Sequence, residues 1–195
     1  MLRIRIEEKA TLLEAFSFSM GDVVCVVGAG GKTTVLYSLA TELRELAMNV
    51  IATTTTRMQI SSNKAISRSL FVREEHDNWV IELGEYLSLH GLATLVETRE
   101  RDDKLIGIDS NRIVEILHLA EYILIEGDGA RSRSLKAPAE HEPVIPTETT
   151  LCVLVVGFDV LGEVVNEKSV HRLDIVRKLS GVKQGGLVTD SVIVD

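Results

Sequence analysis

The chain has 195 residues, of which 45% are hydrophobic and 26% are charged, so we expect one globular domain over residues 1–195. Its 21 Lys and Arg against 29 Asp and Glu give a net charge of −8. This balance argues against a nucleic-acid partner, because phosphate neutralisation requires clustered cations. No apolar run approaches the roughly 18 residues of a membrane span. Charged residues interrupt the apolar ones over residues 2–8, whereas a signal peptide has an unbroken apolar stretch. We therefore expect a cytoplasmic protein without a membrane partner.

Short apolar runs alternate with stretches of helical periodicity along the chain. Strands are predicted at residues 23–27, 50–52, 92–96, 122–125 and 151–156, and helices at 32–48, 77–91, 110–117 and 170–179. We expect Asn49 and Gly91 to end the first two helices, and Asp77 and Ser110 to cap the second and third. Residues 99–104 are predicted as a charged loop. Residues 127–150, which hold all three prolines, are predicted as a long irregular loop.

Alternating strands and helices predict an α/β fold with right-handed crossovers and a mostly parallel sheet. Cys25 and Cys152 each lie within a predicted strand, so we expect both to be buried rather than to form a disulfide or zinc site. Ligands of such sheets bind beyond the carboxyl ends of the strands. Five segments are expected to meet there, namely residues 28–32, 53–56, 97–99, 126–133 and 157–159.

A glycine-rich segment connects the first predicted strand to the first long helix, with the sequence Gly28-Ala29-Gly30-Gly31-Lys32-Thr33-Thr34. Its amides and the helix N-terminus are suited to bind phosphate. Lys32 is expected to contact the β- and γ-phosphates of a nucleoside triphosphate, Thr33 to bind Mg²⁺, and Thr34 to lie near the α-phosphate. This predicts a three-layer fold of the P-loop NTPase type. The segment has the short form Gly-x-x-Gly-Lys-Thr, so a glycine-rich turn with an exposed lysine is the alternative.

Two acidic residues follow the predicted strand at 122–125, and both are candidates for Mg²⁺ binding or for catalysis together with Lys32. Glu126 and Asp128 are two residues apart, so they share one face if the strand continues through them. Solvated acids in a turn are the alternative. Thr54 and Thr55 place hydroxyl groups at the end of another strand, where they either bind a ligand or cap the next element.

The long loop carries further candidates for binding a substrate or partner, namely Arg131, Lys136, His141 and Glu142. Cations that follow a candidate catalytic carboxylate are suited to neutralise a phosphoryl-transfer transition state or to bind an anionic substrate. A solvated loop without a ligand is the alternative.

Four separated motifs together resemble the selenium-dependent molybdenum hydroxylase accessory proteins, the YqeC family. They are Val-Val-Gly-Ala-Gly-Gly-Lys-Thr-Thr at 26–34, Ala-Thr-Thr-Thr-Thr at 52–56, Glu-Gly-Asp-Gly-Ala-Arg at 126–131 and Leu-Lys-Ala-Pro-Ala-Glu-His-Glu-Pro-Val-Ile-Pro at 135–146. The resemblance implies a P-loop nucleotide-binding protein that assists the maturation of such enzymes. Gly127 stands where the family commonly has alanine, which we expect to be a mild change. The family also continues into an Asn-Lys-x-Asp-like element that this chain lacks, so a C-terminal extension is expected to be missing and ATP and GTP both remain candidate ligands.

These observations predict an Mg²⁺-dependent nucleoside triphosphate-binding protein. A slow NTPase coupled to maturation of a selenium-dependent molybdenum hydroxylase is the favoured function, with the apoenzyme or a cofactor carrier as partner. One alternative is an adaptor in which nucleotide binding orders the long loop without significant catalysis. The other is a small-molecule kinase, in which Lys136 and His141 bind the acceptor.

Overall fold

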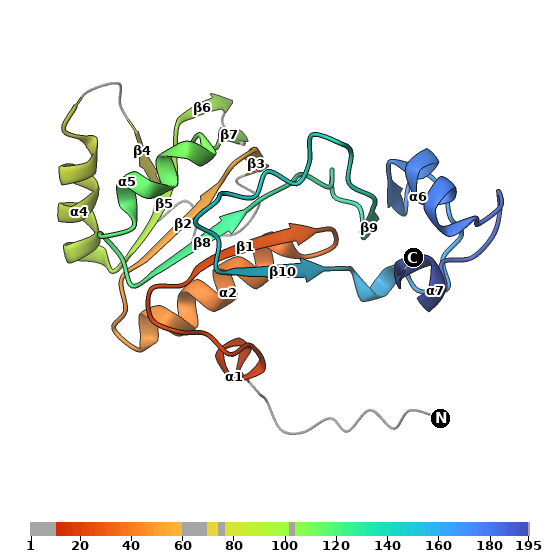
Figure 1. Ribbon diagram of the computed structural model, residues 1–195, viewed down its shortest axis with the longest axis horizontal. Coiled ribbons are helices and arrows are strands. Elements are labelled where there is room, and N and C mark those ends of the chain that lie inside the picture. Colours follow the sequence, from red (N-terminus) through yellow and green to blue (C-terminus); the bar gives the residue numbers. More distant parts are fainter. Residues whose placement is uncertain (1–10, 60–69, 74–76, 102–103, 195) are drawn as a thin grey trace.

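The computed structural model describes residues 11–59, 70–73, 77–101 and 104–194. Its central sheet has six strands in the order β10-β1-β8-β2-β5-β4, and every neighbouring pair is parallel (Figure 1). The strands are β1 (Val23–Gly28), β2 (Val50–Thr54), β4 (Leu70–Val72), β5 (Leu92–Val96), β8 (Tyr122–Glu126) and β10 (Leu151–Val155). The mostly parallel sheet predicted from the sequence is therefore confirmed.

Helices cover both faces of this sheet. The helix α2 (Lys32–Glu45) packs on one face, and the short α1 (Leu12–Ala15) packs against α2. The other face is covered by α4 (Trp79–His90) and α5 (Ile113–Ile116). Alternate residues of the inner strands enter the two apolar clusters, as Val24 and Cys25 of β1 illustrate. Strands that are apolar throughout require this double covering, and the result is a three-layer arrangement consistent with a P-loop-like fold.

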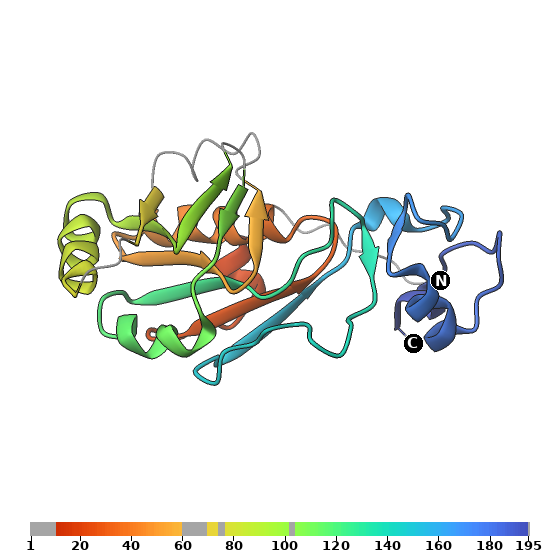
Figure 2. The same cartoon turned by 90° about the horizontal axis from the view of Figure 1, so that it is seen from above.

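Smaller elements lie beyond the carboxyl ends of the strands. An antiparallel sheet contains β3 (Arg57–Gln59), β7 (Lys104–Ile106) and β6 (Thr98–Arg101), while β9 (Leu135–Lys136) pairs with β11 (Val170–His171). Residues 157–194, here called the C-terminal lobe, contain the 3₁₀ turn η2 (Phe158–Val160), α6 (Leu173–Ser180) and α7 (Asp190–Val194). The lobe extends from one end of the sheet (Figure 2). It has an apolar cluster of its own, to which Val160, Val170 and Val176 contribute.

Several predicted helix boundaries are wrong by one to three residues. The first long helix ends at Glu45, and Ala47 takes the left-handed conformation predicted for Asn49. The amides of Ala47 and Met48 bond back to the carbonyls of Arg44 and Leu43, which completes this termination. The second helix is preceded by Asn78 rather than capped by Asp77, and its termination at Gly91 is confirmed. Asp109, not Ser110, caps the 3₁₀ turn η1 (Ser110–Arg112) that leads into α5.

Three other predictions are corrected by the structure. Residues 99–101 and Lys104, predicted as part of a charged loop, lie in strands instead, because Thr98–Arg101 pairs with Lys104–Ile106 in an antiparallel arrangement, while residues 102–103 lie outside the described residues. The helix predicted at 170–179 begins only at Leu173, since Val170–His171 forms a strand. Cys152 is exposed, because β10 is an edge strand with one face turned outward, whereas Cys25 in the neighbouring strand is buried as expected. Among the described residues, no helix is long and apolar enough to cross a membrane.

We predict that Gly127→Ala destabilises the fold by about 1–3 kcal/mol through overpacking. A Cβ atom at Gly127 would lie 2.6 Å from the Cys25 Sγ and 3.2 Å from a Val27 methyl carbon. In a Cys25→Ala background the added methyl group meets no sulfur, so the cost of Gly127→Ala should fall by at least half. Urea denaturation of the four variants in a double-mutant cycle measures this coupling. Gly129→Ala is the control, since no atom lies within 4 Å of a Cβ there, and strictly additive effects would contradict the prediction.

Candidate functional site

The glycine loop between β1 and α2 is held closely against the neighbouring backbone. Gly28 and Gly30 have φ angles of 100° and 72°, which favour glycine because its lack of a Cβ removes the steric penalty. A Cβ at Gly28 would also lie 2.3 Å from the Val155 carbonyl oxygen, and one at Gly30 would lie 2.4 Å from the Gly157 backbone. The loop therefore requires small residues, and it carries the chain directly into the N-terminus of α2.

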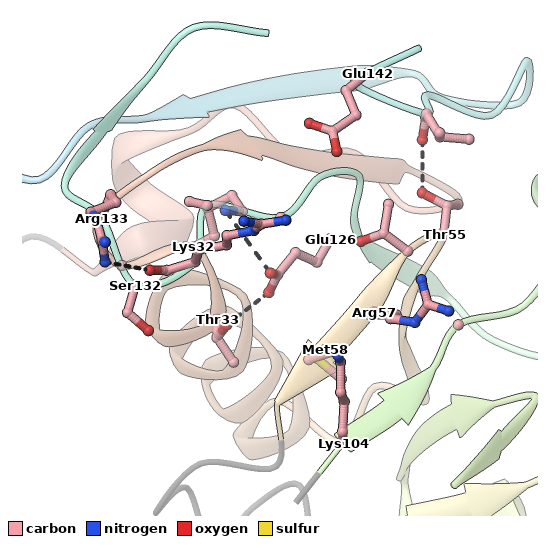
Figure 3. Close-up of a pocket in the computed structure, with 18 of the residues that line it drawn as sticks. Lys32, Thr33, Thr55, Arg57, Met58, Lys104, Glu126, Ser132, Arg133 and Glu142 are labelled. Atoms are coloured by element: carbon pink, nitrogen blue, oxygen red, sulfur yellow. Dashed lines mark hydrogen bonds and ion pairs between the residues drawn. The ribbon is translucent and has the colours of Figure 1, made fainter. Parts of the chain in front are cut away.

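A cavity of about 1150 Å³ opens beside this N-terminus (Figure 3). Its walls come from the glycine loop, the end of β2, the small antiparallel sheet and the long loop. Among the described residues, five Lys and Arg side chains line it against two Glu side chains, although acidic residues outnumber basic ones in the whole chain. The five cations are Lys32, Arg57, Lys104, Arg131 and Arg133, and the two acids are Glu126 and Glu142. An excess of cations in one cavity of an acidic protein favours an anionic ligand.

Lys32 is the first residue of α2, and its side chain is 5% exposed. Its ammonium group donates a hydrogen bond of 2.8 Å to the Gly28 carbonyl. The same nitrogen lies 3.3 Å from the Asp128 Oδ1 and 4.0 Å from the Glu126 Oε1. A buried cation needs such compensation, so an anion that binds Lys32 must compete with the Gly28 carbonyl and Asp128.

Glu126 and Thr33 lie together in the wall of the cavity. The Thr33 hydroxyl donates a hydrogen bond of 2.7 Å to the Glu126 Oε2. Burial raises the pKa of Glu126, and the nearby Lys32 charge and the Thr33 hydrogen bond only partly oppose this effect. A carboxylate and a hydroxyl group at this separation fit Mg²⁺, which prefers one or two carboxylates supplemented by phosphate oxygens and water. Among the described residues, no group of three or more His, Cys, Asp and Glu side chains is placed to hold a metal.

Asp128 lies behind the loop and does not line the cavity. Its side chain is 2% exposed. Both carboxylate oxygens accept hydrogen bonds of 3.1 Å from the Gly28 amide, and the Lys136 ammonium lies 2.7 Å from Oδ2. With Lys32 as a further partner, this carboxylate joins the glycine loop to the long loop. The Mg²⁺-binding and catalytic roles expected for Asp128 stay predictions.

Lys136 extends these contacts to the C-terminal lobe. Its side chain is 1% exposed, and the ammonium donates hydrogen bonds to the Gly129 carbonyl at 2.8 Å and to the Glu142 Oε2 at 2.6 Å. An Arg172 nitrogen lies 2.8 Å from the same Glu142 oxygen. Burial alone would raise the pKa of Glu142, but its hydrogen bonds and ion pairs with Arg172 and Lys136 outweigh that effect and lower it to about 2. Glu142 is therefore ionised at neutral pH.

The structure brings most of the predicted site residues to the cavity. Those that line it are Gly30, Gly31, Lys32, Thr33, Thr34, Thr55, Glu126, Arg131, His141 and Glu142. Thr54 is buried beside it and donates a hydrogen bond of 2.8 Å to the Glu126 carbonyl, while Ala29 is buried and bonds to the Val155 carbonyl. Glu97 lies instead at a neighbouring cavity of about 520 Å³, where it pairs with Arg73.

The sequence analysis did not identify Arg57, Lys104 and Arg172 as part of the site. Arg57 and Lys104 lie on the small antiparallel sheet, and the second of these lies in the segment that was predicted to be a loop. Arg172 is 30 residues distant in sequence from Glu142, and no local motif connects the two. A local pattern could have indicated the strands β6 and β7. Charges alternate in sign at residues 99–101, and Lys104-Leu105-Ile106 follows shortly after.

Comparisons with known proteins were made for the whole chain. A family model described as "YqeC protein" matches residues 24–174, a range that contains the glycine loop and every residue of the network around Asp128. The chain is similar to "Uncharacterized protein YqeC" of Escherichia coli (strain K12), with 29% identity over 187 residues that cover 91% of this chain and 68% of that protein. No solved structure matches the chain.

We predict that Lys136→Met lowers the free energy of unfolding by about 3 kcal/mol or more, because it removes one partner from buried ion pairs. Asp128 and Glu142 would both lose the ammonium group that lies within 2.7 Å of each. Chemical denaturation at pH 7 measures the change. Lys168→Met is the matched control at an exposed lysine, with an expected effect within about 0.5 kcal/mol. A cost below about 1 kcal/mol at Lys136 would show that the network does not stabilise the loop.

Proposed function

We propose that this chain, which belongs to the YqeC family, binds a nucleoside triphosphate with Mg²⁺. The proposed site is the cationic cavity beside α2, whose lining residues all lie within the region that matches the family model. The observation that carries the proposal is the convergence of the loop amides, the Lys32 ammonium and the Glu126–Thr33 pair at the N-terminus of a 14-residue helix. Backbone amides and the helix dipole at such a terminus favour phosphate. ATP and GTP are the two candidate ligands.

The glycine loop would bind the phosphate tail. The Lys32 ammonium is bound to the Gly28 carbonyl and Asp128. We expect it to exchange these partners for β- and γ-phosphate oxygens, while Asp128 keeps the Gly28 amide and Lys136. Because Asp128 retains a cation, the exchange does not leave its carboxylate unpaired, which keeps the cost of moving Lys32 low.

Thr33 and Glu126 would hold Mg²⁺, which neutralises charge on the terminal phosphates. Their hydrogen bond at 2.7 Å shows that the two oxygen atoms already approach within the distance that a shared cation requires. We propose slow hydrolysis of the bound nucleotide, since the cavity is lined by exposed side chains such as Arg131 and is accessible to water. Glu126, as the acidic side chain nearest Lys32 in the cavity wall, is the candidate to orient the attacking water.

The family resemblance extends the proposal to a cellular role, the maturation of a selenium-dependent molybdenum hydroxylase, with the apoenzyme or a cofactor carrier as partner. Turnover separates this function from its alternatives. A hydrolase releases inorganic phosphate without an added acceptor, whereas a small-molecule kinase transfers the γ-phosphoryl group to a specific acceptor and releases the nucleoside diphosphate. A nucleotide-gated adaptor shows negligible turnover, but nucleotide changes the hydrogen exchange of residues 127–150.

We predict that Lys32→Met weakens nucleotide binding by at least tenfold, which corresponds to about 1.4 kcal/mol. Methionine keeps the length of the side chain and removes its charge, so the loop loses the cation while its packing is largely retained. Titration calorimetry with ATP and with GTP in the presence of Mg²⁺ measures the effect, and melting curves without ligand establish that the variant is folded. Lys168→Met serves as the control. Unchanged affinity in a folded Lys32→Met protein would refute the assignment.

We also predict that Mg²⁺-dependent nucleotide binding strengthens as the pH rises. Burial raises the pKa of Glu126 above its usual value of 4.5, and Mg²⁺ binds the ionised carboxylate. Binding should therefore release a proton at pH values below the raised pKa, where the carboxyl group is protonated in the absence of the metal. Calorimetry in buffers of different ionisation enthalpy counts this proton. The Glu126→Gln variant should not release this proton. Titration of the nucleotide itself contributes equally to both proteins, so the difference between their profiles of proton release against pH reports Glu126. Identical profiles for the two proteins would exclude Glu126 as a metal ligand.

A further inference from the structure

Four of the five cations that line the cavity lie outside the glycine loop, and the proposed nucleotide site uses only Lys32. Arg133 is held by carbonyl groups, since its guanidinium donates to the Glu167 and Arg131 carbonyls. Arg57 and Lys104 differ from it in position, because they come from the small antiparallel sheet. Figure 3 shows both on the side of the cavity away from Arg133. These two cations therefore form a second charged wall.

The strand register explains why Arg57 and Lys104 share one wall. Arg57 on β3 is paired with Ile106 on β7, and Lys104 is two residues from Ile106 on the same strand. Directly paired residues and residues two apart lie on one face of a sheet, so all three side chains lie on the same face. Met58 and Leu105 alternate with them and are buried, with exposures of 2% and 0%. The small sheet thus anchors one face in the core and presents two cations and an aliphatic side chain on the other.

This sheet is fixed firmly to the central one. The Gly107 amide donates a hydrogen bond of 2.7 Å to the Thr56 carbonyl, and the Glu97 amide donates one of 2.9 Å to the Ile106 carbonyl. A Cβ at Gly107 would lie only 1.8 Å from the Thr54 carbonyl oxygen, so β7 packs directly against the end of β2. The two cations are therefore held at a set position relative to Thr33 and Glu126, as a binding site requires.

One carboxylate holds the two cations in place without neutralising both. Glu100 lies 3.5 Å from the Arg57 Nε and 3.4 Å from the Lys104 Nζ. The side chains of Arg57 and Lys104 are 60% and 43% exposed, so a ligand reaches them readily. Among the described residues of this wall, two positive charges against one negative charge leave it cationic. The cavity of about 1150 Å³ also exceeds the roughly 300–1,000 Å³ of a pocket for one small ligand.

We infer that Arg57 and Lys104 bind a second ligand, a small organic anion that presents a carboxylate or phosphate group, alongside the nucleotide in the same cavity. The Arg57 guanidinium is suited to bind two oxygen atoms of such a group, Lys104 adds a point charge, and Ile106 offers an apolar contact between them. The inference rests on the proposed nucleotide site for the identity of the first ligand. The cation pair itself does not depend on Lys32.

The test uses the double variant Arg57→Gln/Lys104→Gln. The full chain is saturated with Mg²⁺ and a non-hydrolysable nucleotide analogue and is then titrated with inorganic phosphate or with succinate, and binding is followed by calorimetry. The wild type should bind at least one of these probes saturably, and the double variant should bind it at least tenfold more weakly with nucleotide affinity changed less than twofold. The matched control is Arg99→Gln/Lys168→Gln, which removes the same charge from exposed residues that do not line the cavity.

Three results overturn the inference. The first is that neither probe binds the nucleotide-saturated wild type saturably. The second is that the double variant binds a probe as tightly as the wild type does. The third is that the double variant loses nucleotide affinity tenfold or more, which assigns both cations to the nucleotide. Failure of the proposed function is distinct from all three: the wild type would then bind no nucleotide, while probe binding to the ligand-free protein would still require Arg57 and Lys104.

Discussion

A buried ammonium group, that of Lys32, and the carboxylates that compensate it determine how this site is organised. Removing a charge from water costs several kcal/mol unless paired groups replace the solvent. The Gly28 carbonyl, Asp128 and Glu126 supply that compensation within 4.0 Å. Asp128 in turn binds the Gly28 amide and Lys136, so the same interactions that neutralise Lys32 also fix the glycine loop to the end of β8 and to the long loop.

The network around Lys32 contains as many basic as acidic side chains. Lys32, Lys136 and Arg172 oppose Glu126, Asp128 and Glu142 in one continuous set of contacts. A phosphate tail that takes Lys32, as we propose, would add negative charge to this set, and the further cations that line the cavity and a divalent cation at Glu126 would offset it. The contact from Arg172 to Glu142 also joins the C-terminal lobe to the same network of contacts.

The sequence predicted the sheet and its glycine loop because both depend on local signals. An apolar β-branched run such as residues 23–27 indicates a doubly covered strand, and glycines followed by Lys32 and Thr33 indicate an anion-binding turn. Other features depend on tertiary contacts. Glu126 and Asp128 differ in position because β8 ends at Glu126, so strand alternation does not extend to Asp128. The exposure of Cys152 follows from the edge position of β10, which the apolar composition of that strand conceals.

The role of the small antiparallel sheet was missed for a related reason. Its strands have three or four residues, too few for a clear alternation of apolar and polar positions, and their charged side chains are typical of a loop. Only the pairing of β3 with β7 brings Arg57 and Lys104 to one face. Likewise, Lys136 was predicted as a ligand-binding residue of an irregular loop, whereas its ammonium group is buried among Asp128, Glu142 and the Gly129 carbonyl.

We propose that the glycine loop binds a phosphate tail through an exchange of partners at Lys32. A crystal structure of the protein with Mg²⁺ and a non-hydrolysable triphosphate tests this exchange. We expect phosphate oxygens at the loop amides, the Lys32 ammonium moved from the Gly28 carbonyl onto those oxygens, and Asp128 still bound to Lys136. A complex in which Lys32 keeps its contacts with Gly28 and Asp128, while the triphosphate lies elsewhere, would contradict it.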